Sequence, residues 1–241
     1  MPRRPFIRKQ KKKRHGTNFW DREYTSPEHL ALSTAPSEDF LKFLRYCERH
    51  HPGAMQARTT ALDLGCGNGR QLKYLIDTYQ LPVIGYDISS AAITQAKALC
   101  AHGTADLAVR SIADPLPIPD HSCGLVLDMM TSHFLRTQER SRLKDEIVRV
   151  LQPGGLLLMK TFLRDEDLHT KRLLQDYPGP EPYSYIHPVI GVPEYVYSEA
   201  DLREFLETDF TIHRVYRSHR HRSRGKARKR RTITVYAQKL T

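Results

Sequence analysis

Residues 59–70 read "TTALDLGCGNGR", and this stretch decides the fold class. The apolar run at 61–64 predicts a short buried strand, and the glycines at 65, 67 and 69 predict a tight loop after it. The next ten residues space their apolar side chains as one face of a helix, at Leu72, Leu75 and Ile76. Together these features favour a bound carboxylate or phosphate, because glycines admit close approach and a helix N-terminus offers free N–H groups.

A second unit follows at 81–99, "LPVIGYDISSAAITQAKAL". It predicts a strand over 82–87 that ends in Asp87, followed by a helix capped by Ser89 or Ser90. Asp87 stands about 20 residues after the glycine loop, where an acid at the tip of the second strand can bind the two hydroxyls of a ribose. The glycine loop alone is a weak signal, and the acid that follows it makes a nucleoside-containing cofactor the better interpretation.

The two units resemble motifs I and II of the class I S-adenosylmethionine-dependent methyltransferases, through "LDLGCGNGR" and "GYDIS". That family has D/E-x-G-x-G-x-G where dinucleotide enzymes have G-x-G-x-x-G. The resemblance implies S-adenosyl-L-methionine as cofactor and methyl transfer as activity. It further implies a set of cofactor-binding residues, with the methionine part on the first motif and the ribose on the second: Asp63, Gly65, Cys66, Gly67, Asp87 and Ile88.

Two later stretches extend the resemblance to about residues 58–162. "ADPLPIPDHSCGLVLDMM" is similar to the family's segment after strand three, and "VLQPGGLLLMKTF" to the turn into its fifth strand. Ile112 stands where the family often has an acid that contacts adenine. The backbone around Ala113, or Asp114, is therefore the candidate for the adenine contact.

The whole pattern predicts an α/β fold, a Rossmann-like seven-stranded doubly wound sheet. The family's strand order is 3-2-1-4-5-7-6, with only the last strand antiparallel. We expect a basic, disordered arm at 1–16 and a single domain at 17–241, with a lid insertion at about 163–197 and a basic hairpin loop at 217–231. Strands are predicted near 59–64, 82–87, 105–110, 123–129, 155–161, 209–217 and 232–239.

The aromatic residues upstream of the sheet suggest a cover for the cofactor cleft. An amphipathic helix is predicted at 37–51, and the segment before it contains Trp20 and Tyr24. We expect Trp20 and Tyr24 to fold over the cofactor, an arrangement that resembles the tellurite-resistance and thiopurine-type small-molecule methyltransferases. The alternative is that they only staple the first helix to the body.

Composition excludes several classes of protein. With 241 residues, of which 39% are hydrophobic, the chain can bury a full core as one domain. It has no apolar run of roughly 18 residues and no apolar signal segment, and its four cysteines have no C-x-x-C spacing. We expect a monomer with reduced cysteines, no metal site and no membrane contact. Its expected location is cytoplasmic, or nuclear or nucleolar in a eukaryote.

The charge is strongly segregated along the chain. Eight Lys/Arg lie in 1–14 and ten in 214–231, which leaves 20 basic against 27 acidic side chains elsewhere. Patches of this kind favour a polyanionic partner, with RNA as the first candidate and a localisation signal as the alternative. The connection between the sixth and seventh strands would emerge at the active edge of the sheet. We therefore predict RNA contacts from Arg217, Arg220, Arg222, Arg224, Lys226, Arg228, Lys229, Arg230 and Arg231, although a solvated loop is the alternative.

The lid insertion contributes aromatic candidates. Tyr183 and Tyr185 could stack on a base from a splayed RNA strand. Packing in the core is an equal alternative for both tyrosines.

Catalytic candidates lie at the ends of the fourth and fifth strands. Asp128 and Lys160 match part of the Lys-Asp-Lys-Glu tetrad of ribose 2′-O-methyltransferases, with Lys42 as a candidate first member and Thr232 where the Glu would stand. In the alternative, Asp128 contacts the amino group of the cofactor and Lys160 is an ordinary strand-end charge. His133, and His187 in the lid, could act as general bases.

The sequence thus leads to an S-adenosylmethionine-dependent methyltransferase that acts on RNA, ribosomal or transfer RNA. Two alternatives stay open. The protein could methylate a small molecule, or it could be a non-catalytic RNA-associated assembly factor that keeps the cofactor fold.

Overall fold

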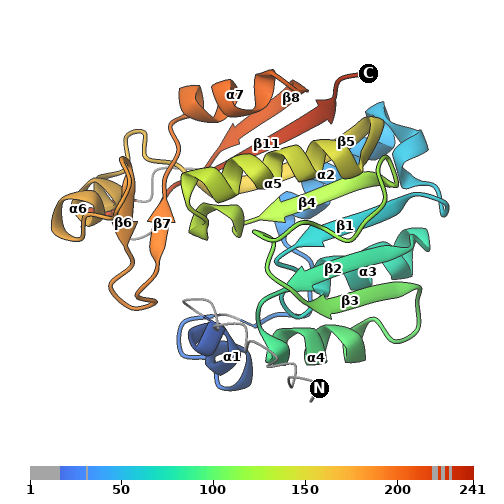
Figure 1. The fold of residues 1–241 in the computed structure, drawn as a ribbon, viewed down its shortest axis with the longest axis horizontal. Coiled ribbons are helices and arrows are strands. Elements are labelled where there is room, and N and C mark those ends of the chain that lie inside the picture. The colour runs from blue at the N-terminus through green and yellow to red at the C-terminus, as the bar shows by residue number, and fades with distance from the viewer. Residues whose placement is uncertain (1–16, 31, 219–221, 224–225, 228–229) are drawn as a thin grey trace, which may run out of the picture.

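Seven strands form the central sheet of the computed structural model, which describes residues 17–30, 32–218, 222–223, 226–227 and 230–241 (Figure 1). The strand order is β3-β2-β1-β4-β5-β11-β8. Strand β11 pairs antiparallel with both β5 and β8, whereas the pairs among β1 to β5 are parallel. The predicted fold, strand order and antiparallel last strand are confirmed. The strands are β1 Thr60–Leu64, β2 Val83–Asp87, β3 Ala105–Val109, β4 Cys123–Met129, β5 Leu151–Phe162, β8 Phe210–Arg217 and β11 Thr232–Lys239.

Helices cover both faces of this sheet and close a core on each side. One core contains buried side chains of α5 and α7, and the other contains those of α2, α3 and α4. The predicted cap of α4 is Ser89, whose Oγ accepts the Ala92 N–H at 3.1 Å. The helices are α2 Glu38–His50, α3 Arg70–Tyr79, α4 Ser90–Leu99, α5 Thr137–Val150 and α7 Glu199–Glu207, with 3₁₀ turns η1 Pro52–Met55 and η2 Ser132–Phe134.

Two peripheral segments lie at the end of the sheet where the parallel strands finish (Figure 1). The first is helix α1, Thr17–Thr25. The second is the 163–197 insertion, which contains α6 (Leu168–Asp176) and a two-stranded hairpin of β6 (Ser184–Ile186) and β7 (Pro193–Tyr195). This is the edge at which open α/β sheets bind their ligands.

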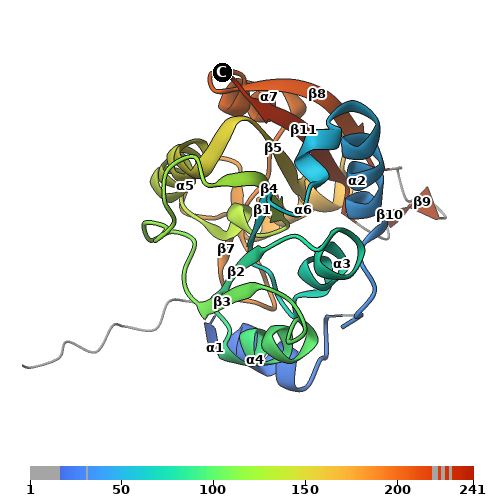
Figure 2. The same cartoon turned by 90° about the vertical axis from the view of Figure 1, so that its right-hand side faces the viewer.

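The connection from β8 to β11 leaves the sheet at the same edge, because Ile233 pairs with Arg217 and Thr232 pairs with Phe162 at the end of β5. It contains the short strands β9 (Arg222–Ser223) and β10 (Lys226–Ala227), which project at the side of the molecule (Figure 2). The predicted arm at 1–16 lies outside the described residues, as do Arg220, Arg224, Arg228 and Lys229. For Arg222 and Lys226 the structure describes only the backbone.

All four cysteines are buried and free. Among the described residues, no helix combines the length and the apolar character that a bilayer span requires.

Candidate functional site

The loop after β1 has the backbone that only glycine adopts readily. Gly65, Gly67 and Gly69 have φ of +78°, +56° and +79°. A Cβ at Gly65 would also overlap the side chain of Thr131, which follows β4. The three glycines therefore allow a tight loop, which packs against Thr131 after β4 and borders the space above the sheet.

A cavity of about 1180 Å³ opens above this loop. Its wall runs from the ends of β1 and β2, under α1, to the 163–197 insertion. Of the predicted cofactor residues, six line it together with Trp20: Asp63, Gly65, Cys66, Gly67, Asp87 and Ile88. The structure brings these residues together, and their roles in binding stay predictions.

We call the part of the cavity beside the glycine loop and the end of β2, where the predicted cofactor residues lie, the cofactor end. Three acidic residues gather there: Asp63, Asp87 and Asp128. Burial, with the nearby charges of Asp87 and Asp128, raises the pKa of Asp63 to about 7. Burial also raises the pKa of Asp128 to about 6, opposed by hydrogen bonds from Ser132. Asp87 is fixed in place, since its two oxygens accept the N–H groups of Gly67 at 3.0 Å and Ser89 at 2.9 Å. This end of the cavity suits a cation, which would relieve the repulsion between carboxylates.

The structure places Asp128, Ala113 and Asp114 outside the cavity wall, and their roles stay predictions. Asp128 is buried behind the cavity wall, where its Oδ1 accepts the Ser132 N–H at 3.1 Å. Ala113 and Asp114 also lie outside the wall, and Ser111 and Ile112 line it instead. In the turn at 111–114 the Ala113 N–H donates to the Ser111 Oγ at 3.2 Å, and Ala113 is half-buried.

Helix α1 covers the cofactor end, as the aromatic pattern predicts. Trp20 lines the cavity and packs edge-on against Phe134, with ring centroids 5.4 Å apart. Tyr24 lies over the glycine loop, where a Cβ at Gly67 would overlap its hydroxyl. Asp21 fixes the helix to the start of α4, because its Oδ1 accepts from the Ser89 hydroxyl at 2.8 Å. The segment therefore covers the cofactor side of the cavity, and Asp21 attaches it to α4.

The opposite end of the cavity contains His133 at the turn after β4. The residue is 1% exposed, lines the cavity and has no hydrogen-bond partner on either ring nitrogen among the described residues. Burial, together with the charges of Arg230 and Arg140, lowers its pKa to about 3, so the ring is neutral. Its ring centroid lies 4.2 Å from that of Phe134 and 5.1 Å from that of Phe162.

Beside His133 lies a buried cluster that the sequence did not reveal. Glu194 of β7 is fully buried, and its Oε2 accepts from both the Tyr185 hydroxyl and the Arg230 guanidinium. Arg230 lies over the ring of Phe162, with its Cζ 3.4 Å from the ring centroid. No motif marks Glu194, because its partners come from β6 and from the β8–β11 connection and meet it only in the folded chain.

The predicted tetrad does not assemble. Lys160 lines the cavity, but its Nζ lies 2.5 Å from the Asp39 carboxylate of α2 and contacts that acid instead of Asp128. Lys42 is exposed on α2 and lies outside the cavity wall. The Nδ1 of His187, a predicted general base, is already occupied, because it accepts the N–H groups of Val189 and Ile190, each at 3.2 Å.

The lid tyrosines have different environments. Tyr185 is fully buried and cannot present a face to a base, so its predicted stacking role is wrong and the core alternative holds. Tyr183 is 51% exposed, but the Arg164 guanidinium covers one face of its ring at 3.6 Å.

Three of the predicted RNA-binding arginines are engaged within the protein. Arg231 is buried and donates to the carbonyl oxygens of Ser218 and Asp165. Arg230 faces the cavity. Arg217 remains exposed but pairs with Glu199 of α7 at 2.5 Å. These three arginines therefore have partners within the protein, and their RNA contacts stay predictions.

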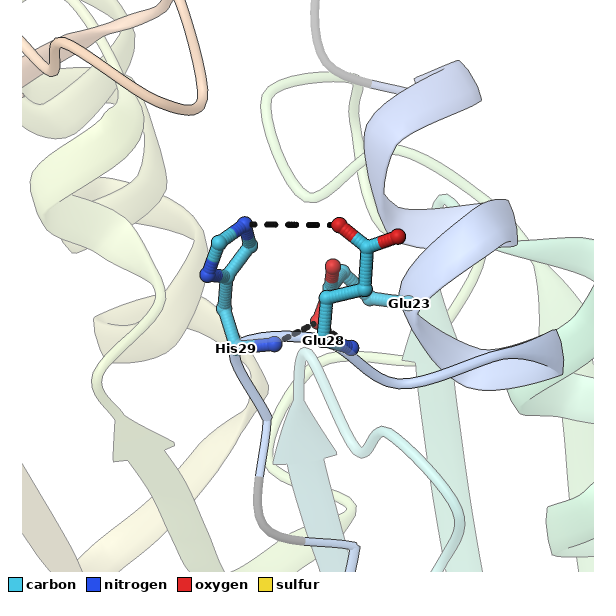
Figure 3. Close-up of side chains that lie close together, drawn as sticks. All are labelled: Glu23, Glu28 and His29. Atoms are coloured by element: carbon cyan, nitrogen blue, oxygen red, sulfur yellow. Dashed lines mark hydrogen bonds and ion pairs between the residues drawn. The ribbon is translucent and has the colours of Figure 1, made fainter.

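A group of Glu23, Glu28 and His29 has the composition of a metal site (Figure 3). Glu23 is buried and its Oε2 accepts the N–H groups of Glu28, His29 and Leu30 at 3.3, 2.8 and 3.0 Å. Burial alone would raise the pKa of Glu23, but these three bonds outweigh it and lower that pKa. The carboxylate thus fixes the loop whose His29 and Leu30 line the cavity.

Comparison with known proteins gives one family. Residues 62–159 match the model of a family described as a methyltransferase domain. A phthiotriol/phenolphthiotriol dimycocerosates methyltransferase of Mycobacterium ulcerans is 32% identical over 145 residues, which are 58% of this chain and 50% of that protein. A glycine/sarcosine/dimethylglycine N-methyltransferase of Actinopolyspora halophila is 30% identical over 54% of this chain and 24% of its own length. The chain spans about half the length, or less, of such curated relatives.

Solved structures agree along most of the chain. A crystal structure of a methyltransferase dependent on S-adenosylmethionine from Methanosarcina mazei is 26% identical, with a TM-score of 0.65, and the match covers 78% of this chain and 96% of that one. The N-methyltransferase NodS of Bradyrhizobium japonicum, in complex with S-adenosyl-L-homocysteine, has a TM-score of 0.66 at 15% identity, with 95% and 100% covered. The second likeness shows the shared fold.

Proposed function

The chain belongs to the class I S-adenosylmethionine-dependent methyltransferases, and we propose that it methylates a small molecule enclosed between η2 and the 163–197 insertion. The curated relatives that it matches are mostly methyltransferases of small molecules by their names.

The residues at the cofactor end fit S-adenosylmethionine. The cofactor has two cationic groups, and the acids that crowd this end, Asp63 and Asp87 in the wall with Asp128 behind it, are held in a state that a cation would stabilise. Asp63 and the loop of Gly65 to Gly67 would hold the methionine part, and Asp87 the ribose. When bound, the cofactor supplies an electrophilic methyl group.

The size and shape of the cavity support a small acceptor. A single small-ligand pocket is typically roughly 300–1,000 Å³, and this cavity of about 1180 Å³ exceeds that range. It therefore has room for a second molecule next to a cofactor. The second molecule would lie between η2 and the insertion, where Pro178, Ile186 and Val192 add an apolar wall.

Alignment and exclusion of water are what the chain contributes to the reaction. Much of the rate of a methyl transfer can come from holding the acceptor in line with the methyl group. Phe134, Phe162 and Ile190 of the cavity wall would exclude water from the reacting atoms, and Trp20 would close the cofactor side.

The test is the partition of a labelled methyl group. The protein is incubated with tritiated S-adenosylmethionine and, in separate reactions, with a small-metabolite extract and with total RNA. We expect label in the metabolite fraction and none in RNA, and loss of that label in Asp87→Ala. Label in RNA alone would refute a small acceptor, and label in neither fraction would favour a non-catalytic protein.

RNA is the second candidate, because of one specific observation. The β8–β11 connection leaves the sheet at the cavity edge, and its sequence at 219–229 has six Lys/Arg with no acid. Replacement of Arg220, Arg222, Arg224, Lys226, Arg228 and Lys229 by Ser should abolish methylation of RNA and leave cofactor affinity unchanged, if RNA is the substrate. RNA methylation that survives this replacement would exclude that role for the connection.

A further inference from the structure

The acceptor end of the cavity has a distinct chemical character, which rests on the proposed function and refines it. The rings of Phe134 and Phe162 line this end of the cavity, and His133 lies against both of them. Aromatic side chains prefer offset or edge-to-face contact with another ring. Such a wall favours a planar occupant over an aliphatic one.

Two polar groups in this wall have unused hydrogen-bonding capacity. Oε1 of Glu194 has no hydrogen-bond partner among the described residues, whereas Oε2 accepts from both Tyr185 and Arg230. Both ring nitrogens of His133 also lack a partner there. Buried polar atoms are almost always satisfied. Glu194 and His133 line the cavity, so the missing partners point to a ligand that supplies them.

The charges around these atoms select a neutral ligand. Arg230 contacts Glu194 and lies on Phe162, and the pocket between them has the carboxylate and guanidinium side by side. Because the charges of Glu194 and Arg230 offset each other, this end of the cavity leaves no unpaired charge for a charged ligand to neutralise. A neutral hydroxyl or aromatic amine has the hydrogen-bond donor that Oε1 lacks and carries no charge for either residue to repel.

We propose that Glu194, His133 and Phe162 form a binding subsite for a planar aromatic acceptor that carries a neutral hydroxyl or amino group. The Glu194 Oε1 accepts the hydrogen bond of that group, and the ring packs against Phe162 and Phe134. Arg230 and Tyr185 position the Glu194 carboxylate. Arg230, at the end of the β8–β11 connection, is thus part of the acceptor site.

The structure gives a reason why the carboxylate is oriented. Its Oε2 accepts from Tyr185 of β6 and from Arg230, so that Oε1 is the oxygen left without a donor. His187 stands 3.9 Å from Oε1, beyond hydrogen-bond distance. The hydroxyl or amino group of the ligand would donate the hydrogen bond that Oε1 lacks.

The test compares three probes that share a methyl-substituted ring. Binding to the full chain, without cofactor, is measured by calorimetry or saturation-transfer NMR with 4-methylphenol, 4-methylanisole and 4-methylbenzylamine. Loss of one hydrogen bond to a charged group corresponds to roughly tenfold in affinity. We expect 4-methylphenol to bind about tenfold more tightly than 4-methylanisole, which lacks the donor, and more tightly than the cationic amine.

Two variants locate the effect. Glu194→Ala should remove the preference for 4-methylphenol over 4-methylanisole, whereas Arg142→Ala, an exposed change on α5, should leave it unchanged. Equal binding of the phenol and the anisole by the wild type would overturn the proposal without any variant. Tightest binding of the amine would overturn it as well.

Failure of this inference is distinguishable from failure of the proposed function. If the methyl label reaches small metabolites but the phenol and the anisole bind alike, only the aromatic-donor subsite is wrong. If the label reaches RNA alone, the small-acceptor function is wrong whatever the probes show.

Discussion

Gly65 is the residue at which backbone conformation and packing act together. Its φ of +78° is disfavoured for other residues, and a Cβ would overlap Thr131 at the end of β4. Gly53, by contrast, has nothing within 4 Å of an added Cβ. The pair separates a glycine that the site requires from one that it does not.

We expect Gly65→Ala to lower the free energy of unfolding by about 1–3 kcal/mol and to weaken cofactor binding, because the loop must shift away from Thr131. Gly53→Ala is the control and should change stability by less than about 0.5 kcal/mol. Chemical denaturation and calorimetric titration with S-adenosylmethionine measure both. A Gly65→Ala protein with unaltered stability and affinity would contradict the described loop.

Asp63 gives a prediction that depends on pH. Its pKa is about 7 in the folded protein against an ordinary value of 3.8. Between these values the folded state holds a proton that the unfolded state has released, so stability falls as pH rises from about 4 to about 7. Above pH 7 the cost of the buried charge is complete. Asp128, with a pKa raised to about 6, acts in the same direction.

Asp63→Asn should therefore be more stable than the wild type at pH 8, by on the order of 2 kcal/mol, and similar to it near pH 4. It should also lose the rise in melting temperature that S-adenosylmethionine gives the wild type. Asp106→Asn, an exposed change on β3, is the control. A less stable Asn variant at pH 8, or one that the cofactor still stabilises, would refute the role of Asp63.

Among the helices and strands, the sequence predicted those features that depend only on residues close together in the chain. The strands, the Ser89 cap and the placing of Asp87 follow from apolar runs and a glycine loop within 59–99. The Glu194–Arg230 contact joins residues 36 positions apart in sequence, and only the antiparallel return of β11 brings them together. The stacking role assigned to Tyr185 is wrong for the same reason, because exposure of a lid residue depends on what packs over it.

Arg230 holds the hairpin of β6 and β7 in place. Arg230 joins β6 and β7 through Tyr185 and Glu194, so Arg230→Ala should increase amide hydrogen exchange at 184–195 without changing exchange in β1 or β4. Arg142→Ala should change neither region. Unaltered protection of 184–195 in Arg230→Ala would show that the hairpin is held by other contacts.

For the whole molecule, the charge segregation predicts how the chain meets polyanions. The six basic residues between 219 and 229 should give salt-dependent, sequence-independent binding to a single-stranded RNA probe, with a slope against log salt of about 0.7 per neutralised phosphate. Replacement of all six by Ser should reduce that slope and leave methylation of the proposed small acceptor intact. An unchanged slope would place RNA binding elsewhere on the chain.

The single tryptophan allows a direct test of the cofactor site beneath α1. Trp20 is the only tryptophan in the chain, and it lines the cavity on the cofactor side. Titration with S-adenosylmethionine should give a saturable change in Trp20 fluorescence with a stoichiometry of one, and Asp87→Ala should abolish it. Cofactor binding detected by calorimetry without a change in Trp20 fluorescence would contradict a cofactor site beneath α1, as would the absence of binding.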